Sequence, residues 1–270
     1  MLQLNQRKWL RRMRRIIISA DDFGLTEAVT KGIAESIRKG VVSRTSAMMC
    51  TQGAQWISQY KEGLEGKIGL HLQLTDGRPL LPEKQVPSLL NGRGLFARKR
   101  PLIRLENLNP VELEAEWEAQ MQALLSTGVQ PTHIDTHHNV HRYPKVFNVF
   151  LKLAIKYQLP ARALSPEMAM RLEAHGLLGA KSCLRSSWDE NLTDDLFIMQ
   201  VLGAFRQQAN DGLLEVMCHP GYVDQALRER SHYLAIREKE LKVFCDPALP
   251  AKLKKHRIEV ESFDNTTVTV

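Results

Sequence analysis

The stretch of sequence that decides the fold is residues 16–40, IIISADDFGLTEAVTKGIAESIRKG. Its apolar start is short and ends in two acids, Asp21 and Asp22, which is the pattern of a buried strand. Thr26 is a favourable N-cap for the helix that follows, and Gly40 comes directly after the last turn. A strand, a short loop and a helix are therefore predicted in this order.

The same order of strand and helix repeats along the chain. Strands are predicted at 16–21, 42–50, 68–74, 132–137, 214–218 and 257–263, with weaker β signals at 161–164 and 181–184. Helices are predicted at 26–38, 54–62, 110–124, 144–157, 166–176, 193–209 and 228–243. This alternation predicts an α/β fold with a parallel sheet covered by helices.

Seven or eight strands in a chain of 270 residues favour a (β/α) barrel over an open doubly wound sheet. Nucleotide-binding versions of the open sheet lose support because neither G-x-G-x-x-G nor G-x-x-x-x-G-K-[ST] occurs. Residues 16–265 are expected to form one domain. Within it, the glycine- and proline-rich stretch 75–109 is too long for a plain loop, so an insertion or lid is predicted there.

The net charge of +7 is concentrated at the start of the chain. Six of the 37 basic residues lie in residues 1–15, which contain no acid, so the remainder has 31 basic and 30 acidic residues. A nearly neutral body predicts no nucleic-acid partner. We interpret residues 1–15 as a flexible basic tail. The alternative is a tail that contacts an anionic membrane surface through Trp9, Leu10 and Met13.

The four cysteines, Cys50, Cys183, Cys218 and Cys245, are widely separated and form no C-x-x-C pair. This usage is typical of reduced thiols in the cytoplasm, where we expect the protein to be located. No apolar run approaches the ~18 residues of a membrane span. The apolar stretch after the basic tail is too short for a signal peptide.

Polar residues lie in or directly after several of the predicted strands. Asp21 and Asp22 end the first strand, His71 lies in the third, and His219 follows the strand at 214–218. The carboxyl ends of parallel strands meet at one end of a barrel, where active sites are found. We therefore expect these side chains to converge, although a capping turn or a hydrogen-bonded core position explains each one alone.

The fourth predicted strand and the residues after it carry the densest group of histidines. His133, Asp135 and His137 share one face because side chains alternate along a strand. Polar groups on the inner face of a buried strand need partners or a metal. We expect metal ligands among these histidines and His71, with Asp135 orienting an imidazole. His138 and His141 either cap the following helix or contact substrate.

Four blocks of sequence occur in order: ADDFG at 20–24, GLHLQLT at 69–75, PTHIDTHH at 131–138 and EVMCHP at 215–220. Together they resemble the YdjC-like carbohydrate deacetylases. That family includes chitooligosaccharide deacetylase and the hopanoid-biosynthesis-associated deacetylase-like proteins. The resemblance extends over most of residues 16–263.

The resemblance implies an incomplete or distorted (β/α) barrel and the removal of acetyl groups from N-acetylated sugars. It also implies a divalent metal, magnesium, held by Asp22, His71 and His137, with Asp21 as the catalytic carboxylate. Two histidines and one carboxylate suit zinc, iron or manganese as well, so the metal stays open. Asn139 stands where many members carry a further histidine.

Hydrolysis of an N-acetyl group needs a nucleophilic water and a protonated leaving amine. We expect Asp21 to take the proton of a metal-activated water and His219 to protonate the amine. Trp188 and Tyr222 are candidates for stacking against the sugar. The expected partner is an acetylated amino sugar, on a chitooligosaccharide or linked to a lipid, and a homodimer is expected.

Two alternatives belong to other classes. One is another metal-dependent barrel hydrolase, such as a phosphoesterase, and the other is a non-catalytic sugar-binding relative. Few arginines or lysines stand in the four blocks, which disfavours a phosphoesterase. The acids and histidines of the blocks are all present, which disfavours a protein that only binds sugar.

Overall fold

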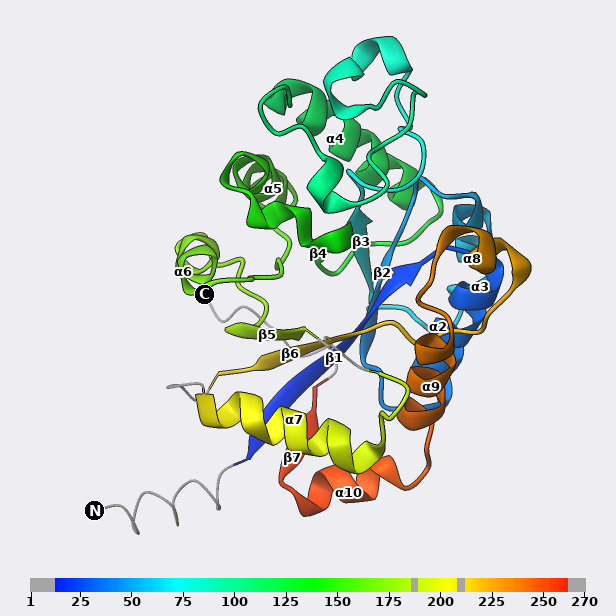
Figure 1. Ribbon diagram of the computed structural model, residues 1–270. Helices are drawn as coiled ribbons and strands as arrows, with labels where there is room; N and C mark the ends of the chain where they lie inside the picture. The colour runs from blue at the N-terminus through cyan, green and yellow to red at the C-terminus, as the bar shows by residue number, and fades with distance from the viewer. Residues whose placement is uncertain (1–12, 186–188, 208–211, 262–270) are drawn as a thin grey trace.

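The structure, a computed structural model, describes residues 13–185, 189–207 and 212–261 and contains a parallel sheet of seven strands (Figure 1). In spatial order these are β4 (Ile134–Thr136), β3 (Ile68–Leu72), β2 (Arg44–Ala47), β1 (Arg14–Phe23), β6 (Leu214–Cys218) and β5 (Ser182–Arg185). The seventh strand, β7 (Ile258–Val260), pairs with the start of β1. The sheet curls into a half-barrel, so the predicted incomplete (β/α) barrel is confirmed.

Helices connect the strands and cover the outer face of the curled sheet (Figure 1). They are α2 (Glu27–Lys39), α3 (Ile57–Tyr60), α4 (Pro110–Ser126), α5 (Pro144–Tyr157), α6 (Pro166–Glu173), α7 (Asp194–Gln207), α8 (Gln225–Arg230), α9 (Ala235–Phe244) and α10 (Leu249–Lys255). Among the described residues, none of them is both long and apolar enough to cross a membrane.

The helix starts predicted from capping residues are confirmed. Thr26 accepts a hydrogen bond from the amide of Val29, and Gly40 follows the end of α2. Asn109 accepts one from the amide of Val111 at the start of α4. These signals are local, because an N-cap side chain bonds to amides only two or three residues further along.

The barrel begins two residues earlier than the sequence suggested. Arg14 is 5% exposed, its backbone pairs with β7, and its guanidinium donates to the carbonyl of His256 at 3.1 Å. The predicted tail boundary at residue 15 is therefore wrong, since residues 14 and 15 belong to β1. Residues 1–12 lie outside the described part of the chain.

Two other predicted elements are corrected. The helix expected at 228–243 is two helices, α8 and α9, separated by residues 231–234. The hydroxyl of Ser231 accepts from the amide of Tyr233 there, and such a side-chain bond competes with the helical pattern. The weak β signal at 161–164 is reduced to Ala161, which forms isolated parallel bridges with Ile134 of β4 and with Leu178.

The insertion at 75–109 is folded back onto α4 through a buried carboxylate. Glu116 is fully buried and accepts hydrogen bonds from the amides of Leu80 and Leu81, each at 3.0 Å. The side-chain amide of Gln120 donates to the same carboxylate at 3.0 Å. The insertion is thereby fixed beside the carboxyl ends of β3 and β4.

Replacing Glu116 with Ala is expected to lower the free energy of unfolding by about 2–3 kcal/mol, because two amides of the insertion lose their acceptor. Urea denaturation measures this change. Glu114→Ala, on the same helix as Glu116, is the matched control, since Glu114 makes an exposed ion pair with Lys152 of α5. Equal stability of the two variants would show that other contacts hold the insertion.

Candidate active site

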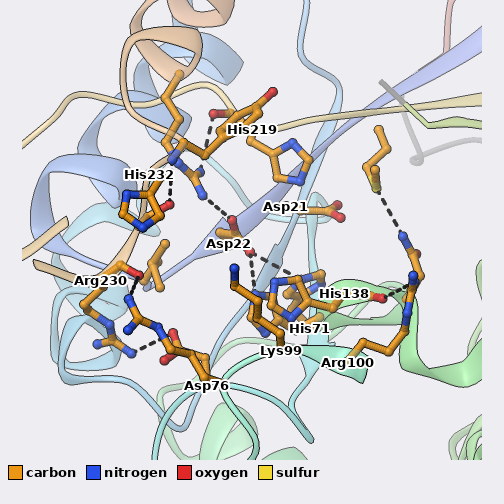
Figure 2. Close-up of a pocket in the computed structure, with 18 residues that line it drawn as sticks. Asp21, Asp22, His71, Asp76, Lys99, Arg100, His138, His219, Arg230 and His232 are labelled. Carbon is orange, nitrogen blue, oxygen red and sulfur yellow. Dashed lines mark hydrogen bonds and ion pairs between the residues drawn. The ribbon is translucent and has the colours of Figure 1, made fainter. Parts of the chain in front are cut away.

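A cavity of about 770 Å³ opens at the carboxyl ends of the strands (Figure 2). Asp21, Asp22, His71, His137 and His219 all line it. They come from the ends of β1, β3, β4 and β6, so folding brings together the five residues to which the sequence assigned the chemistry. This is the end of the barrel at which parallel strands present functional groups.

The two adjacent acids both reach the cavity because the strand alternation breaks there. The pairing of β1 with β2 shifts register between Ala20 and Phe23. Asp22 has a φ of 74°, in the left-handed region that non-glycine residues rarely adopt. Strained backbone of this kind is found at functional sites, where the surrounding fold maintains it. The irregularity lets consecutive side chains line one cavity.

Three potential ligand atoms converge beside Asp22. Its Oδ1 lies 3.5 Å from Nε2 of His71 and 4.0 Å from Nε2 of His137. All three side chains are buried. Their orientation is set from behind: Nδ1 of His71 lies 2.6 Å from Oδ1 of Asp135, and Nδ1 of His137 lies 2.9 Å from the carbonyl of Thr75.

These contacts determine which ring nitrogens can bind a cation. A carbonyl or carboxylate oxygen only accepts, so Nδ1 carries the hydrogen in both rings. The lone pair of each neutral imidazole is then on Nε2, which faces Asp22. A hydrogen bond to the other ring nitrogen is the usual support of a metal-binding histidine. Asp135 therefore orients an imidazole, as its position on the strand suggested.

Asp22, His71 and His137 differ in their pKa values and therefore in their protonation at neutral pH. Burial opposes ionisation of Asp22, but Arg237 and His71 outweigh it and hold the pKa of Asp22 well below its usual range. Burial lowers the pKa of His71, yet Asp135 and Asp21 outweigh it and raise that pKa to about 10. Burial lowers the pKa of His137 to about 4. Without a cation, the site therefore holds one proton in addition to the two Nδ1 hydrogens, and this proton is on Nε2 of His71.

A second group of ligand atoms lies deeper in the barrel. Atoms of Asp21, His71 and Asp135 come within 4.8 Å of one another. Arg162 occupies this group, donating to both oxygens of Asp21 at 2.7 and 2.8 Å and contacting Asp135 at 2.9 Å. A guanidinium repels a cation and uses the carboxylate lone pairs. The group around Asp22 is the better candidate for a metal.

Arg162 also connects the site to a charged layer inside the barrel. It bonds to Glu215 at 2.8 Å, and Glu215 bonds to Arg44 at 2.7 Å. Arg162, Arg44 and Glu215 are all buried, and the sequence did not single out any of them. The only available signal was an ionisable residue within an apolar strand, such as Glu215 in β6.

Of the other predicted histidines, only His138 lines the cavity. Its ring stacks on His137 with centroids 3.8 Å apart. His133 is buried inside the barrel against Gly69 and does not line the cavity. His141 bonds to Thr136 at 2.6 Å and stacks on Phe150 in the core. The sequence placed His133 among the candidate metal ligands and left His141 either to cap the following helix or to contact substrate. Neither residue lines the cavity, because the strand and the turn after it direct them elsewhere.

The predicted sugar-stacking residues find no support. Tyr222 does not line the cavity, and its hydroxyl donates to Glu35 on α2 at 2.7 Å. Trp188 lies outside the described residues. The aromatic residue that does line the cavity is Tyr233, whose ring meets His219 edge to face with centroids 5.5 Å apart.

The mouth of the cavity is basic, although few arginines or lysines stand in the four blocks of sequence. Arg98, Lys99 and Arg100 from the insertion line it, together with Arg230 and His232 from the segment around the end of α8. Arg230 pairs with Asp76 at 2.9 Å. These basic groups stand outside the four blocks and come together because the insertion and the segment around α8 meet at the cavity.

Comparison with known proteins identifies the family of this chain. A family model described as YdjC-like protein matches residues 15–255. The chain belongs to the YdjC-like family. The carbohydrate deacetylase of Geobacillus stearothermophilus is 35% identical over 252 residues, covering 93% of this chain and 97% of that protein. The carbohydrate deacetylase of Halalkalibacterium halodurans is 32% identical, covering 85% and 94%.

Solved structures of this family and beyond it show the same fold. A protein of Enterococcus faecalis, provisionally described as a cellobiose-phosphate cleavage protein, superimposes with a TM-score of 0.81 at 32% identity. The match covers 93% of this chain and 98% of that protein. A CE4 esterase of Streptococcus mutans matches with a TM-score of 0.53 at 12% identity, which is a likeness of fold alone.

Proposed function

We propose that this protein is a metal-dependent carbohydrate deacetylase that hydrolyses the N-acetyl group of acetylated amino sugars. The observation that carries the proposal is the convergence of Asp22 Oδ1 with Nε2 of His71 and of His137 in the wall of a large cavity. Relatives of the YdjC-like family that cover most of the chain carry the name carbohydrate deacetylase.

The residues present fit a divalent cation. Ligand atoms that share one metal at about 2.1 Å lie roughly 3–3.5 Å apart. From Oδ1 of Asp22, Nε2 of His71 at 3.5 Å is within this range, and Nε2 of His137 at 4.0 Å would have to move closer. Asp22, His71 and His137 would hold the ion. When bound, it would act as a Lewis acid on the acetyl carbonyl and on the attacking water. The resemblance implies magnesium, whereas two imidazoles are more typical of zinc, manganese or iron.

Two further residues of the cavity, Asp21 and His219, would carry out the proton transfers. Asp21, held in one orientation by Arg162, would take a proton from the attacking water. His219 would pass a proton to the leaving nitrogen. Burial lowers the pKa of His219, so its ring is neutral at neutral pH before the reaction. The proton that reaches the amine is therefore one gained during turnover.

The basic mouth of the cavity extends the proposal to the substrate. Three cations of the insertion and two groups near α8 favour an acetylated sugar that carries a negative charge, such as a phosphate ester. The Enterococcus relative is described in terms of a sugar phosphate, which agrees with this proposal. Chitooligosaccharides and lipid-linked amino sugars remain the neutral alternatives to be compared.

Acetate release tests the function. Metal-free protein is loaded with zinc, manganese or magnesium and incubated with N-acetylglucosamine, diacetylchitobiose, its phosphate ester and a lipid-linked N-acetylated sugar. We expect acetate only after metal loading, and fastest release from the phosphate ester. A phosphate assay on the same samples addresses the phosphoesterase alternative. Phosphate release without acetate would replace the proposed function.

A further inference from the structure

Helix α9 carries two buried charged residues at the cavity, of which Arg237 lines it. Arg237 is 4% exposed and Glu240 is fully buried. They are three residues apart, so they lie on the same face of the helix. Burial of charged side chains is costly unless each has partners, and their partners here belong to the site.

Both residues bond to the backbone of His219. The amide of His219 donates to Oε2 of Glu240, and Nη1 of Arg237 donates to the carbonyl of His219 at 3.4 Å. Arg237 also donates through Nη2 to Oδ2 of Asp22 at 2.6 Å. Helix α9 therefore fixes the position of His219 relative to Asp22.

Tyr233 completes the arrangement. Its hydroxyl donates to Oε1 of Glu240 at 2.5 Å, and its ring packs edge to face against the ring of His219. The guanidinium of Arg237 lies 5.6 Å from the centre of the same ring. Glu240 thus accepts one hydrogen bond from the backbone of His219 and another from the residue that packs against its side chain.

We propose that Glu240 is a positioning residue whose ionised carboxylate holds His219 and Tyr233 in place, and that its protonation weakens this hold and slows turnover. The proposal rests on the deacetylase function proposed above. It adds a pH-dependent support of His219 that is separate from the metal ligands.

The chemistry of a carboxyl group gives the reason. An ionised carboxylate only accepts, so it satisfies both donors. A protonated carboxyl group is itself a donor, so the bond with Tyr233 would reverse, with the hydroxyl accepting. The amide of His219 would then donate to an uncharged oxygen, which is a weaker acceptor than a carboxylate. Burial raises the pKa of Glu240 to about 7, although its two hydrogen bonds act in the opposite direction. The change therefore occurs near neutral pH.

The other groups that act on Glu240 come from two strands and its own helix. Arg237 on α9 lowers the pKa of Glu240, and Asp21 on β1 raises it. Cys218 and His219 at the end of β6 are the remaining titratable neighbours. The nearby helix α2 also carries charged groups. Its Glu35 pairs with Lys39 and accepts a hydrogen bond from the hydroxyl of Tyr222, and its Lys31 lies over the ring of Tyr222.

The test compares the pH dependence of kcat in three variants. The metal is kept at a saturating concentration at every pH, so that metal loss does not contribute to the profile. In the unmodified protein we then expect kcat to fall below about pH 7. Glu240→Gln should lower kcat and remove this acidic limb, because the amide does not titrate. Tyr233→Phe should move the limb to higher pH by about half to one unit, because a hydrogen bond to the ionised form is lost. Glu238→Gln, on the exposed face of α9, is the matched control and should keep the original profile.

Infrared spectroscopy of metal-free protein gives a readout that does not depend on activity. A protonated carboxyl band should disappear as the pH rises through about 7, and Glu240→Gln should lack it. An acidic limb that persists in Glu240→Gln, or that Tyr233→Phe does not move, would overturn the proposal, as would the absence of the band. If the unmodified protein releases no acetate, the deacetylase function fails, while the infrared result still decides whether Glu240 takes up a proton.

Discussion

The Asp21→Asn variant is expected to keep its metal and to lose about 10²–10⁴-fold in kcat, with little change in substrate binding. Asparagine has the shape of aspartate but takes no proton from water at neutral pH. Arg162 would still bond to Asp135 and Glu215, so the buried network keeps most of its partners. Acetate release and metal content, measured on the same sample, check this expectation.

Asp22→Asn is the adjacent control and should behave differently. Oδ1 of Asp22 faces both histidines, so loss of its charge should weaken metal affinity, and added metal should restore part of the activity. Metal loss in Asp21→Asn together with metal retention in Asp22→Asn would exchange the two roles. If neither substitution affects acetate release, the proposed mechanism is wrong.

Removal of either imidazole of the metal site should also have a large effect, in this case on metal retention. His71→Ala and His137→Ala are expected to abolish metal retention and, with it, activity, because each removes one of three ligand atoms. Metal content after dialysis is the direct measurement. His141→Ala is a useful comparison, since His141 stacks on Phe150 in the core and does not line the cavity. Full metal occupancy in His71→Ala or His137→Ala would refute the ligand assignment.

Metal uptake should also release one proton. The pKa of His71 is raised to about 10, so this ring is protonated at neutral pH, whereas His137, with a pKa of about 4, is already neutral. A bound cation replaces the proton on His71. The Kd for metal should therefore rise about tenfold for each unit that the pH falls between 8 and 6. Calorimetry in buffers of different ionisation enthalpy counts the protons, and a pH-independent Kd would contradict this protonation state.

The deeper group of ligand atoms makes a distinguishable prediction. If Asp21, His71 and Asp135 held the ion instead, His137→Ala would keep its metal and Asp21→Asn would lose it. The presence of Arg162 among these atoms is the physical reason to expect the opposite result. The same two variants therefore decide between both sites.

Much of the fold could be predicted because its signals are local. The cap of α2 at Thr26, the start of α4 at Asn109 and the whole of β6 depend on residues within a few positions. The break between α8 and α9 was not predictable in this way. No glycine or proline marks it, and the competing bond of the Ser231 hydroxyl becomes clear only in the folded chain.

The sequence alone determined the alternation of strands and helices, and it determined that acids and histidines stand at the ends of four strands. Only the tertiary structure decided which atoms face each other, as with Nε2 of His71 and of His137 beside Asp22. It also decided the roles of Arg162 and Glu240, which no motif contains. Their partners are far away in sequence, and burial, which sets the pKa of each group, exists only after the chain has folded.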